Sequence, residues 1–171
     1  MDIRIRIDAD KAREGFARAP DVMTRHLDAK LGRGAAEIAR EAQQRVSKVF
    51  STLWASIRSL RVASLHWRVQ TGVNYARAVE EGTKPGYLPN PVHLRAWIKA
   101  RHGIGFAHIG SNERGAQYDE IHDRAWALAR FIQAHGTKPH PYMKPAAEAK
   151  RSRVIQLAEE GVRDGLKEIF G

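Results

Sequence analysis

Residues 57–70, IRSLRVASLHWRVQ, decide the fold of this chain. Apolar and polar residues alternate there in two runs, first Leu60 and Val62, then Leu65, Trp67 and Val69. A period of two places successive side chains on opposite faces of a strand. The stretch therefore predicts two strands with a join near Ala63–Ser64, in a small and mostly antiparallel sheet.

A long amphipathic helix is predicted before these strands, over residues 20–49. Its apolar positions recur every three or four residues: Met23, Leu27, Leu31, Ala35, Ile38, Ala42, Val46 and Val49. A straight helix over this range is about 45 Å long, which matches or exceeds the width of a compact domain of this size. We expect its end to project or to rest on a neighbouring subunit. Gly32 and Gly34 leave open a break into two shorter helices.

Two further elements are predicted at the N-terminus. Ile3, Ile5 and Ile7 alternate with arginines, a pattern typical of a strand. Residues 9–18 predict a short helix, which Pro20 separates from the long one because proline suits the first turn of a new helix.

The second half of the chain reads mainly as helix. A short helix is predicted over 75–82, with Gly82 in the left-handed conformation that ends it. Asn90 and Pro91 begin the next helix, which Gly103 ends. Residues 103–117 read as a glycine-rich mobile loop, Asp119 to Gly136 as a helix, 137–145 as an extended segment, and Pro145 to Phe170 as the last helix.

The predicted fold class is α+β. A small, mostly antiparallel sheet packs against the long N-terminal helix, and the C-terminal third is helical. With 171 residues, the chain is most simply one domain over 1–171, with a helical and glycine-rich excursion at about 84–117.

Composition limits the classes of function. The chain has 29 Lys and Arg against 19 Asp and Glu, a net charge of +10, which favours contact with nucleic acid, anionic membranes or acidic proteins. It has no cysteine, and therefore no disulfide framework, thiolate zinc site or cysteine nucleophile. No apolar run is long enough to cross a bilayer, and MDIRIRID does not resemble a signal peptide. We expect a protein made in the cytoplasm, without a membrane partner.

Catalysis and metal binding find little support. The closest histidine pairs, His135 with His140 and His102 with His108, are five and six residues apart across loops, whereas zinc sites favour tight pairs on one helix face. Glu80 and Glu81 are neighbours on a helix and point apart. No phosphate loop, nucleophile elbow or dinucleotide fingerprint is present. We expect no enzyme activity, no metal and no cofactor.

Basic residues follow the predicted helices, interleaved with acidic ones, a pattern more typical of a solvated helix face than of a nucleic-acid groove. No recognition motif is present, so any DNA contact is expected to be electrostatic and independent of sequence. The candidate DNA-facing residues are Arg33, Arg40, Arg151 and Arg153.

Two segments carry a resemblance to a known family. They are YARAVEEGT, residues 75–83, and GTKPHPYMKPA, residues 136–146. Together they resemble the tail-completion (neck) proteins of long-tailed bacteriophages and prophages. That family pairs a Tyr-Ala-x-x-Val-Glu-x-Gly-Thr segment with a later Pro-aromatic-apolar-x-Pro-Ala segment that opens the last helix. The likeness covers about residues 10–170, although Ser51-Thr52-Leu53-Trp54 replaces the Thr-Gly-x-Leu turn common in the family.

The resemblance implies a non-enzymatic virion subunit at the head–tail junction. It implies a ring of copies, expected to be six, which helps to join the tail to the DNA-filled head, surrounds the DNA channel and contacts neighbouring neck and tail proteins. The motif residues, which either maintain the fold or form a subunit interface, are Tyr75, Val79, Glu80, Gly82, Thr83, Pro141, Tyr142, Met143 and Pro145. The alternatives are a tail terminator or head-side adaptor of the same connector and, less favoured, a basic cellular protein that binds nucleic acid.

The second segment also carries a prediction about its two adjacent apolar residues. Neighbours in an extended chain point to opposite sides. Met143 suits irregular core packing, and Tyr142 suits a half-buried boundary because its ring has a polar end. We therefore expect Met143 to face the core and Tyr142 to face the boundary or a partner.

Overall fold

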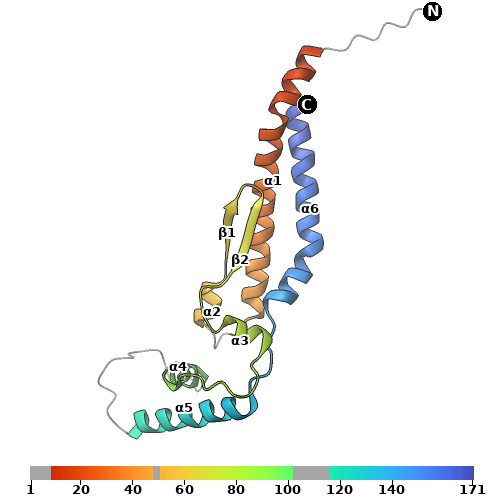
Figure 1. Cartoon of the computed structure of the whole chain (residues 1–171). Helices are drawn as coiled ribbons and strands as arrows, with labels where there is room; N and C mark the ends of the chain where they lie inside the picture. The colour runs from red at the N-terminus through yellow and green to blue at the C-terminus, as the bar shows by residue number, and fades with distance from the viewer. Residues whose placement is uncertain (1–8, 48–50, 102–115) are drawn as a thin grey trace, which may run out of the picture. The chain divides into compact units, whose positions relative to one another are not determined.

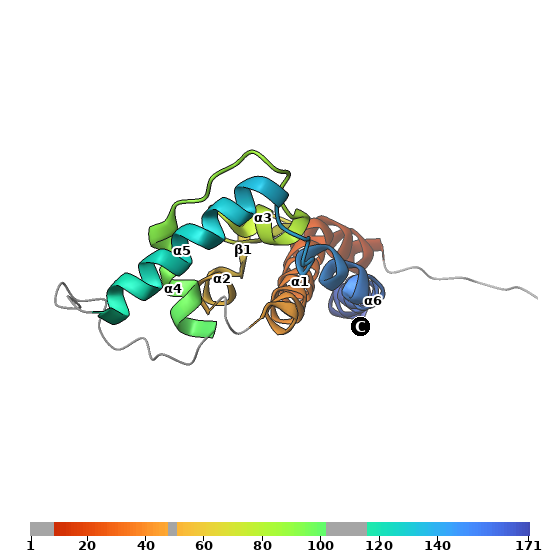
Figure 2. The same ribbon diagram turned by 90° about the horizontal axis from the view of Figure 1, so that it is seen from below.

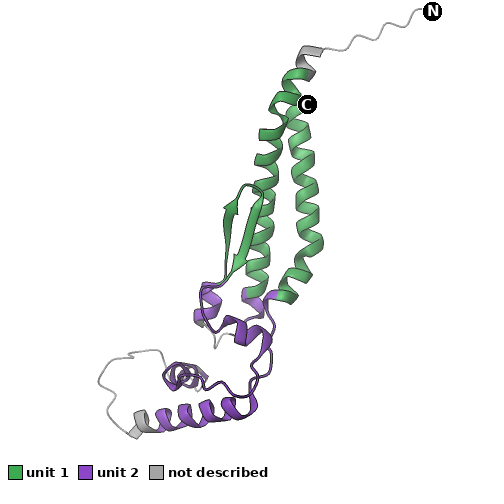
Figure 3. Ribbon diagram, in the orientation of Figure 1, with its two compact units in different colours: residues 1–42, 57–70, 144–171 green, residues 43–56, 71–143 purple. Residues whose placement is uncertain are grey.

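The computed structural model describes residues 9–47, 51–101 and 116–171. The chain divides into two compact units, each built from segments that are distant in the sequence (Figure 3). Unit 1 comprises residues 1–42, 57–70 and 144–171, and unit 2 comprises residues 43–56 and 71–143. A single domain over 1–171 with an excursion at about 84–117 stays a prediction.

Unit 1 has three layers. It contains most of α1 (Ala9–Arg45), the antiparallel strands β1 (Arg58–Ala63) and β2 (His66–Gln70), and nearly all of α6 (Met143–Phe170). Helix α1 lies between the hairpin and α6, as both views show (Figures 1 and 2). The predicted α+β class, with its small sheet on a long N-terminal helix and its helical C-terminal third, is confirmed.

The prediction of two helices separated at Pro20 is wrong. Helix α1 runs through Pro20 without a break and ends at Arg45, before the predicted residue 49. An internal proline costs a helix a hydrogen bond and a steric clash, but contacts with α6 support this part of α1. Gly15 lies against Ile169, and the rings of Phe16 and Phe170 meet edge to face at 5.5 Å. Long-range packing thus overrides the local signal.

The hairpin agrees with its sequence pattern. Strands β1 and β2 pair with Arg58 opposite Gln70 and Ala63 opposite His66, so the turn falls where it was predicted. The turn residue Leu65 has a positive φ of 57°, a strained conformation for a residue with a side chain.

An aspartate on α1 holds this turn in place. Asp28 Oδ1 accepts hydrogen bonds from the Leu65 amide at 2.9 Å and the Trp67 indole at 3.2 Å, and its Oδ2 accepts one from Arg61 Nε at 2.7 Å. The Trp67 ring also lies against Gly32, where a β-carbon would approach it within 2.7 Å. Sequence reasoning missed Asp28, because its partners lie 33 to 39 residues away in the sequence.

Helices α1 and α6 are antiparallel and pack closely where one of them has a glycine. Gly34 lies against Val154, Gly161 against Leu27, and Gly165 against Met23. A β-carbon at Gly161 would lie 3.3 Å from both the His26 carbonyl oxygen and the Leu27 α-carbon. The absence of side chains at these glycines therefore sets the spacing of the two helices.

Among its described residues, unit 2 contains the short or medium helices α2 (Ser51–Ser56), α3 (Ala76–Glu81), α4 (Pro91–Arg101) and α5 (Ala116–His135). Helix α4 packs on α5, and apolar residues are buried along them, namely Ile98, Ile121, Ala125 and Ala129. As predicted, Asn90 caps α4, because its Oδ1 accepts the Val92 amide at 2.9 Å. Helix α3 ends at Gly82, also as predicted.

Some predicted boundaries need correction. Helix α5 begins at Ala116 rather than Asp119, and α6 at Met143 rather than Pro145. Helix α2 was not predicted, since six residues are too few to show a helical period. The predicted strand at residues 3–7 and nearly all of the glycine-rich loop, with its Gly103 helix end, lie outside the described residues.

Candidate functional site

Residues 75–83 of the first motif segment and 136–143 of the second lie side by side in unit 2, although more than fifty residues separate them in the sequence. Thr83 and Thr137 form an antiparallel bridge, each donating its amide to the other's carbonyl, at 3.2 Å and 3.0 Å. Their hydroxyl oxygens are 3.0 Å apart. A threonine at the end of one segment is thus paired with a threonine near the start of the other.

Two glycines make this approach possible. Gly82 has a φ of 74° and Gly136 a φ of 72°, in the left-handed region that favours glycine. A β-carbon on Gly82 would lie 2.4 Å from the Thr137 carbonyl oxygen, and one on Gly136 would lie 2.0 Å from the Thr83 carbonyl oxygen. Both positions therefore exclude a side chain, first because of the backbone conformation and second because a carbonyl oxygen of the facing segment occupies the space.

The contact continues along the second segment. The amide of His140 donates to the carbonyl of Val79, with 2.8 Å between nitrogen and oxygen. One Glu80 oxygen, Oε2, then accepts the amides of Tyr142 at 2.7 Å and Met143 at 2.9 Å. Helix α6 begins at Met143, so Glu80 satisfies amides that have no partner within the helix and places a negative charge at its positive end.

The predicted roles of Met143 and Tyr142 are reversed. Tyr142 is only 2% exposed, whereas Met143 is half-buried. The prediction assumed an extended chain at both residues, but Met143 already belongs to the first turn of α6. Burial raises the pKa of the Tyr142 hydroxyl, and the nearby charge of Glu80 raises it further.

Tyr75, the first aromatic residue of the motifs, is held by hydrogen bonds to helix α2. The Tyr75 hydroxyl forms hydrogen bonds with the Thr52 side chain and the Leu53 backbone of α2. Burial raises the Tyr75 pKa, although these hydrogen bonds act in the opposite direction. Leu53 is fully buried, so the helix that sequence reasoning missed helps to position the first motif.

The remaining motif residues are prolines. Pro141 is exposed just before Tyr142, and Pro145 is half-buried in the first turn of α6. Proline is accepted in a first turn because its missing amide is not needed there. Hydrogen bonds thus join five of the motif residues across the two segments, namely Val79, Glu80, Thr83, Tyr142 and Met143. The role of the motif residues at a subunit interface stays a prediction.

The four candidate DNA-facing arginines divide into two pairs. Arg33 pairs with Glu37 at 3.3 Å, and Arg153 pairs with Glu37 and Glu160 at 3.8 Å and 3.1 Å. Arg40 and Arg151 are exposed, and within the described residues neither has a carboxylate partner. Only the second pair has a charge available for phosphate, and DNA contact stays a prediction.

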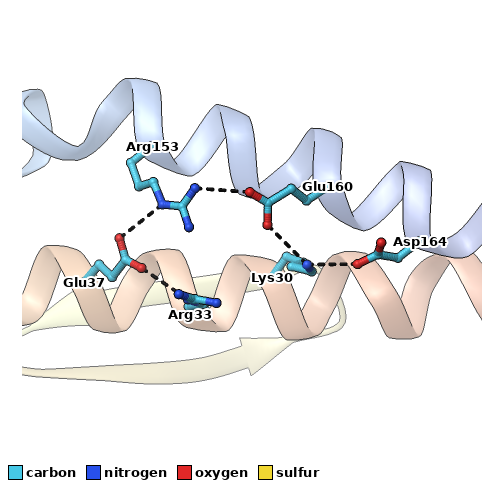
Figure 4. A network of polar contacts seen from close by, with 6 residues as sticks. All are labelled: Lys30, Arg33, Glu37, Arg153, Glu160 and Asp164. Carbon is cyan, nitrogen blue, oxygen red and sulfur yellow. Dashed lines mark hydrogen bonds and ion pairs between the residues drawn. The ribbon is translucent and has the colours of Figure 1, made fainter.

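A network of ion pairs joins α1 to α6 (Figure 4). Lys30 Nζ lies 3.3 Å from Glu160 and 2.9 Å from Asp164, and hydrogen bonds from Lys30 hold the pKa of each of these carboxyl groups below its ordinary value. Nearer the C-terminal end of α6, Glu168 pairs with His26 and Arg25, which lower its pKa in the same way. The network accounts for many of the charges that sequence analysis assigned to a solvated face.

Over 9–47, 51–101 and 116–171, no three His, Asp or Glu side chains converge as metal ligands. His102 and His108 lie outside these ranges. Glu81 pairs with Arg77 at 2.7 Å on the same helix, while Glu80 binds backbone amides. The expectations of no metal, no cofactor and no enzyme activity stay predictions.

Comparison with known proteins identifies no relative of this chain. No protein-family model, curated protein or solved structure matches this chain. Among the helices described, none has the length and apolar character needed to cross a membrane.

Proposed function

We propose that this chain is a non-enzymatic structural protein of the bacteriophage neck. In this function, copies form a ring at the head–tail junction of the virion, help to join the tail to the DNA-filled head and surround the DNA channel. The proposal rests on the resemblance of residues 75–83 and 136–146 to the tail-completion family. The observation that supports it most is that backbone and side-chain hydrogen bonds join these two segments.

The contact matters because the resemblance depends on both segments together. Chance matches in unrelated parts of a chain have no reason to meet in space. Several shared positions make the contact, namely Val79, Glu80, Gly82 and Thr83 in the first segment and Tyr142 and Met143 in the second, while Gly136 and Thr137 precede the shared pattern of the second segment. Gly82 and Thr83 meet Gly136 and Thr137, and Glu80 binds the amides of Tyr142 and Met143. The motifs therefore read as two halves of one structural unit that positions the surfaces around it.

The charge balance suits a protein beside packaged DNA. The net charge of +10 favours phosphate, and exposed arginines such as Arg40 and Arg151 can neutralise it without reading bases. A ring that allows DNA to pass needs such weak, sequence-independent contact.

A deletion experiment tests the function. In a phage whose genome lacks this gene, we expect DNA-filled heads and complete tails that remain separate in the electron microscope. Purified protein added to that lysate should restore joined, infectious particles. A phage without the gene that still gives normal yields of joined virions would overturn the proposal.

The same experiment separates the alternatives. Loss of a tail terminator gives tails of uncontrolled length, because nothing stops their growth. Loss of a head-side adaptor gives heads that do not retain their DNA. Either result would place the chain elsewhere in the connector, and a reconstruction of the intact neck gives the number of copies, which we expect to be six.

A further inference from the structure

We propose that the outer face of the β1–β2 hairpin, the face turned away from α1, is the surface through which this chain contacts DNA phosphates (Figure 1). The inference rests on the proposed neck function, because it specifies which part of each subunit faces the DNA. It differs from the sequence prediction, in which all four candidate arginines belong to the long helices α1 and α6.

Alternation along the strands places two arginines on this outer face. Arg61 and Trp67 are directly opposite each other and both donate hydrogen bonds to α1, so their side chains face inward. Residues one position away face outward, which puts Arg68 on the outer face with Leu60 directly opposite it. Arg58, two residues before Leu60, lies on the same face, and both arginines are exposed. Diagonal neighbours of this kind are about 7–8 Å apart, so one DNA backbone can contact both.

No carboxylate of the hairpin or of the adjacent part of α1 competes for these two charges. Residues 57–70 contain three arginines and neither aspartate nor glutamate. From residue 28 to its C-terminal end, α1 has three carboxylates, and all are paired: Asp28 with Arg61, Glu37 with Arg33 and Arg153, and Glu41 with Lys150. Within the part of the chain that the structure describes, Arg58 and Arg68 have no carboxylate partner. Two full positive charges therefore face outward.

The four candidate arginines on the helices are less available to phosphate. Two of them are in ion pairs with carboxylates. Arg40 follows Glu37 by three residues on α1, and Arg151 follows Glu148 by three residues on α6. Residues three apart are neighbours on a helix surface, so a phosphate that approaches either arginine also meets a carboxylate. The hairpin has no such neighbour.

The hairpin is also held in a fixed position. Asp28 accepts hydrogen bonds from the Leu65 amide in the turn and from the Trp67 indole, and the Trp67 ring lies on Gly32. A strand of six residues such as β1 spans about 20 Å, and a two-stranded ribbon is narrow enough to enter the major groove of DNA. Because the hairpin is ordered before DNA arrives, binding does not have to order it.

The other exposed side chains of the hairpin favour contact with the DNA backbone over recognition of bases. Leu60 and Val62 are 39% and 48% exposed. Apolar side chains cannot form hydrogen bonds with base edges, whereas a guanidinium group binds phosphate whatever the base. The contact is therefore independent of sequence, as the passage of DNA through a ring requires.

An anionic membrane is the other partner that suits a basic and partly apolar surface. Membrane-binding surfaces usually place tryptophan at the level of the lipid headgroups. The tryptophan of this hairpin, Trp67, faces α1 instead. We therefore assign the outer face to DNA.

Neutralising the two arginines tests this surface. Fluorescence anisotropy measures binding of the purified full chain to a duplex of about 25 base pairs between about 20 and 200 mM salt. We expect R58Q/R68Q to lower the affinity by about tenfold or more. The slope of log affinity against log salt should also fall by about two, since two phosphate contacts are lost. Circular dichroism melting should show both arginines to be dispensable for folding, because they are exposed.

The matched control is R18Q/R163Q. It removes two exposed arginines of α1 and α6 that, among the described residues, likewise have no ion-pair partner. The net charge changes equally in both double variants, but the control should keep the salt slope of the wild type. Equal losses in the two variants would overturn the assignment, and so would a wild-type chain that does not bind the duplex at the lowest salt.

Photo-cross-linking gives an independent reading, because the chain has no cysteine of its own. V62C and I155C each introduce one cysteine, on the hairpin and on α6, at positions that are 48% and 52% exposed. After labelling with a photoactivatable cross-linker and irradiation with the duplex, V62C should link to DNA and I155C should not. A link from I155C as strong as that from V62C would contradict the proposal.

Vesicles that contain phosphatidylserine distinguish the membrane from DNA. If R58Q/R68Q loses binding to these vesicles but keeps the duplex affinity of the wild type, the outer face serves a membrane and the assignment to DNA is wrong. Sedimentation of the vesicles with bound protein provides this measurement.

The two proposals can fail separately. If deletion of the gene separates heads from tails while R58Q/R68Q binds the duplex like the wild type, the neck function stands and only this surface is wrong. If R58Q/R68Q loses duplex binding while deletion leaves virions intact, the hairpin binds DNA as proposed but the neck function is wrong.

Discussion

Glu80 lies at the start of α6, with its Oε2 2.7 Å from the amide nitrogen of Tyr142, sixty-two residues further along the chain. The same oxygen accepts the amide of Met143. A carboxylate from one motif thus acts as the N-terminal cap of a helix opened by the other. This relationship explains why a glutamate in the first segment accompanies a proline-rich helix start in the second.

Removing this carboxylate should destabilise the protein. We expect Glu80→Ala to lower the free energy of unfolding by about 1–2 kcal/mol, the usual value of a helix cap. Glu80→Gln should lose less, because its amide oxygen still accepts hydrogen bonds. The control is Glu81→Ala, which removes only an exposed pair with Arg77 and should cost less than about 0.5 kcal/mol. Urea unfolding followed by circular dichroism measures all three, and equal effects at positions 80 and 81 would contradict the capping role.

The two glycines of the motif contact should not tolerate alanine. Gly82→Ala and Gly136→Ala each force a side chain into the left-handed region and against a carbonyl oxygen of the facing segment. We expect a loss of more than about 2 kcal/mol for each. Gly72→Ala is the control, since nothing lies within 4 Å of its β-carbon position, and it should stay near wild type. Thermal melting ranks the three variants, and a melting temperature for Gly82→Ala like that of the control would contradict the close approach.

Local signals in the sequence predicted the elements that local forces determine. The alternation of residues 57–70 predicted both strands and their turn, Gly82 predicted the end of α3, and Asn90 with Pro91 predicted the start of α4. Each of these signals acts within a few residues: a side-chain period, a backbone conformation or a cap. No signal of this kind predicted the contact between the two motif segments. Only their joint resemblance to one family suggested that they belong together.

The wrong predictions concern places where contacts between residues distant in the sequence determine the structure. Pro20 predicted a helix boundary, but Gly15 and Phe16 pack on α6 and keep α1 continuous. For Tyr142 and Met143, the extended-chain argument did not include the capping contact from Glu80. No periodicity in the sequence encodes which residue sixty positions away binds a backbone amide.

The structure reverses the expected effects of substitution at these two residues. Tyr142→Ala should cost about 3–5 kcal/mol, as for a buried aromatic residue, while Met143→Ala should cost clearly less because Met143 is half-buried. Tyr142→Phe keeps the packing and should be tolerated. Tyr87→Ala is the control, since that tyrosine is largely exposed. Chemical unfolding compares the four, and a folded, stable Tyr142→Ala would favour the opposite assignment, with Met143 facing the core.

Any contact with DNA should depend on salt and not on sequence. Neutralised phosphates release counterions, so we expect affinity to fall steeply between about 50 and 200 mM salt. Arg40→Glu with Arg151→Glu should weaken binding more than Arg33→Gln, because Arg33 is already paired with Glu37. Fluorescence anisotropy with two unrelated duplexes measures both effects. A clear preference for one duplex at fixed salt would count against the neck function.

Acid should destabilise unit 1 through its paired carboxylates. Burial pushes the pKa of Asp28 upward, but hydrogen bonds from Arg61, Leu65 and Trp67 outweigh it, so its pKa lies below the ordinary value. The pKa values of Glu160, Asp164 and Glu168 are lowered as well. Near pH 4, where ordinary carboxyl groups titrate, the unfolded chain therefore binds more protons than the folded one, and stability rises with pH.

The stabilisation from these four groups is thus complete above their ordinary pKa values and is lost as the pH falls through the lowered ones. We expect the free energy of unfolding to decrease from about pH 5 to pH 3. Asp28→Asn should be less stable at pH 7 and should show a shallower decrease, because one of the linked protons is gone. Glu159→Gln, which removes a carboxylate without an ion-pair partner among the described residues, should leave the profile parallel to wild type. Urea unfolding at a series of pH values provides the comparison. If Asp28→Asn and the wild type lose stability with the same slope, the hydrogen bonds of Asp28 at the hairpin turn do not hold its charge as the geometry requires.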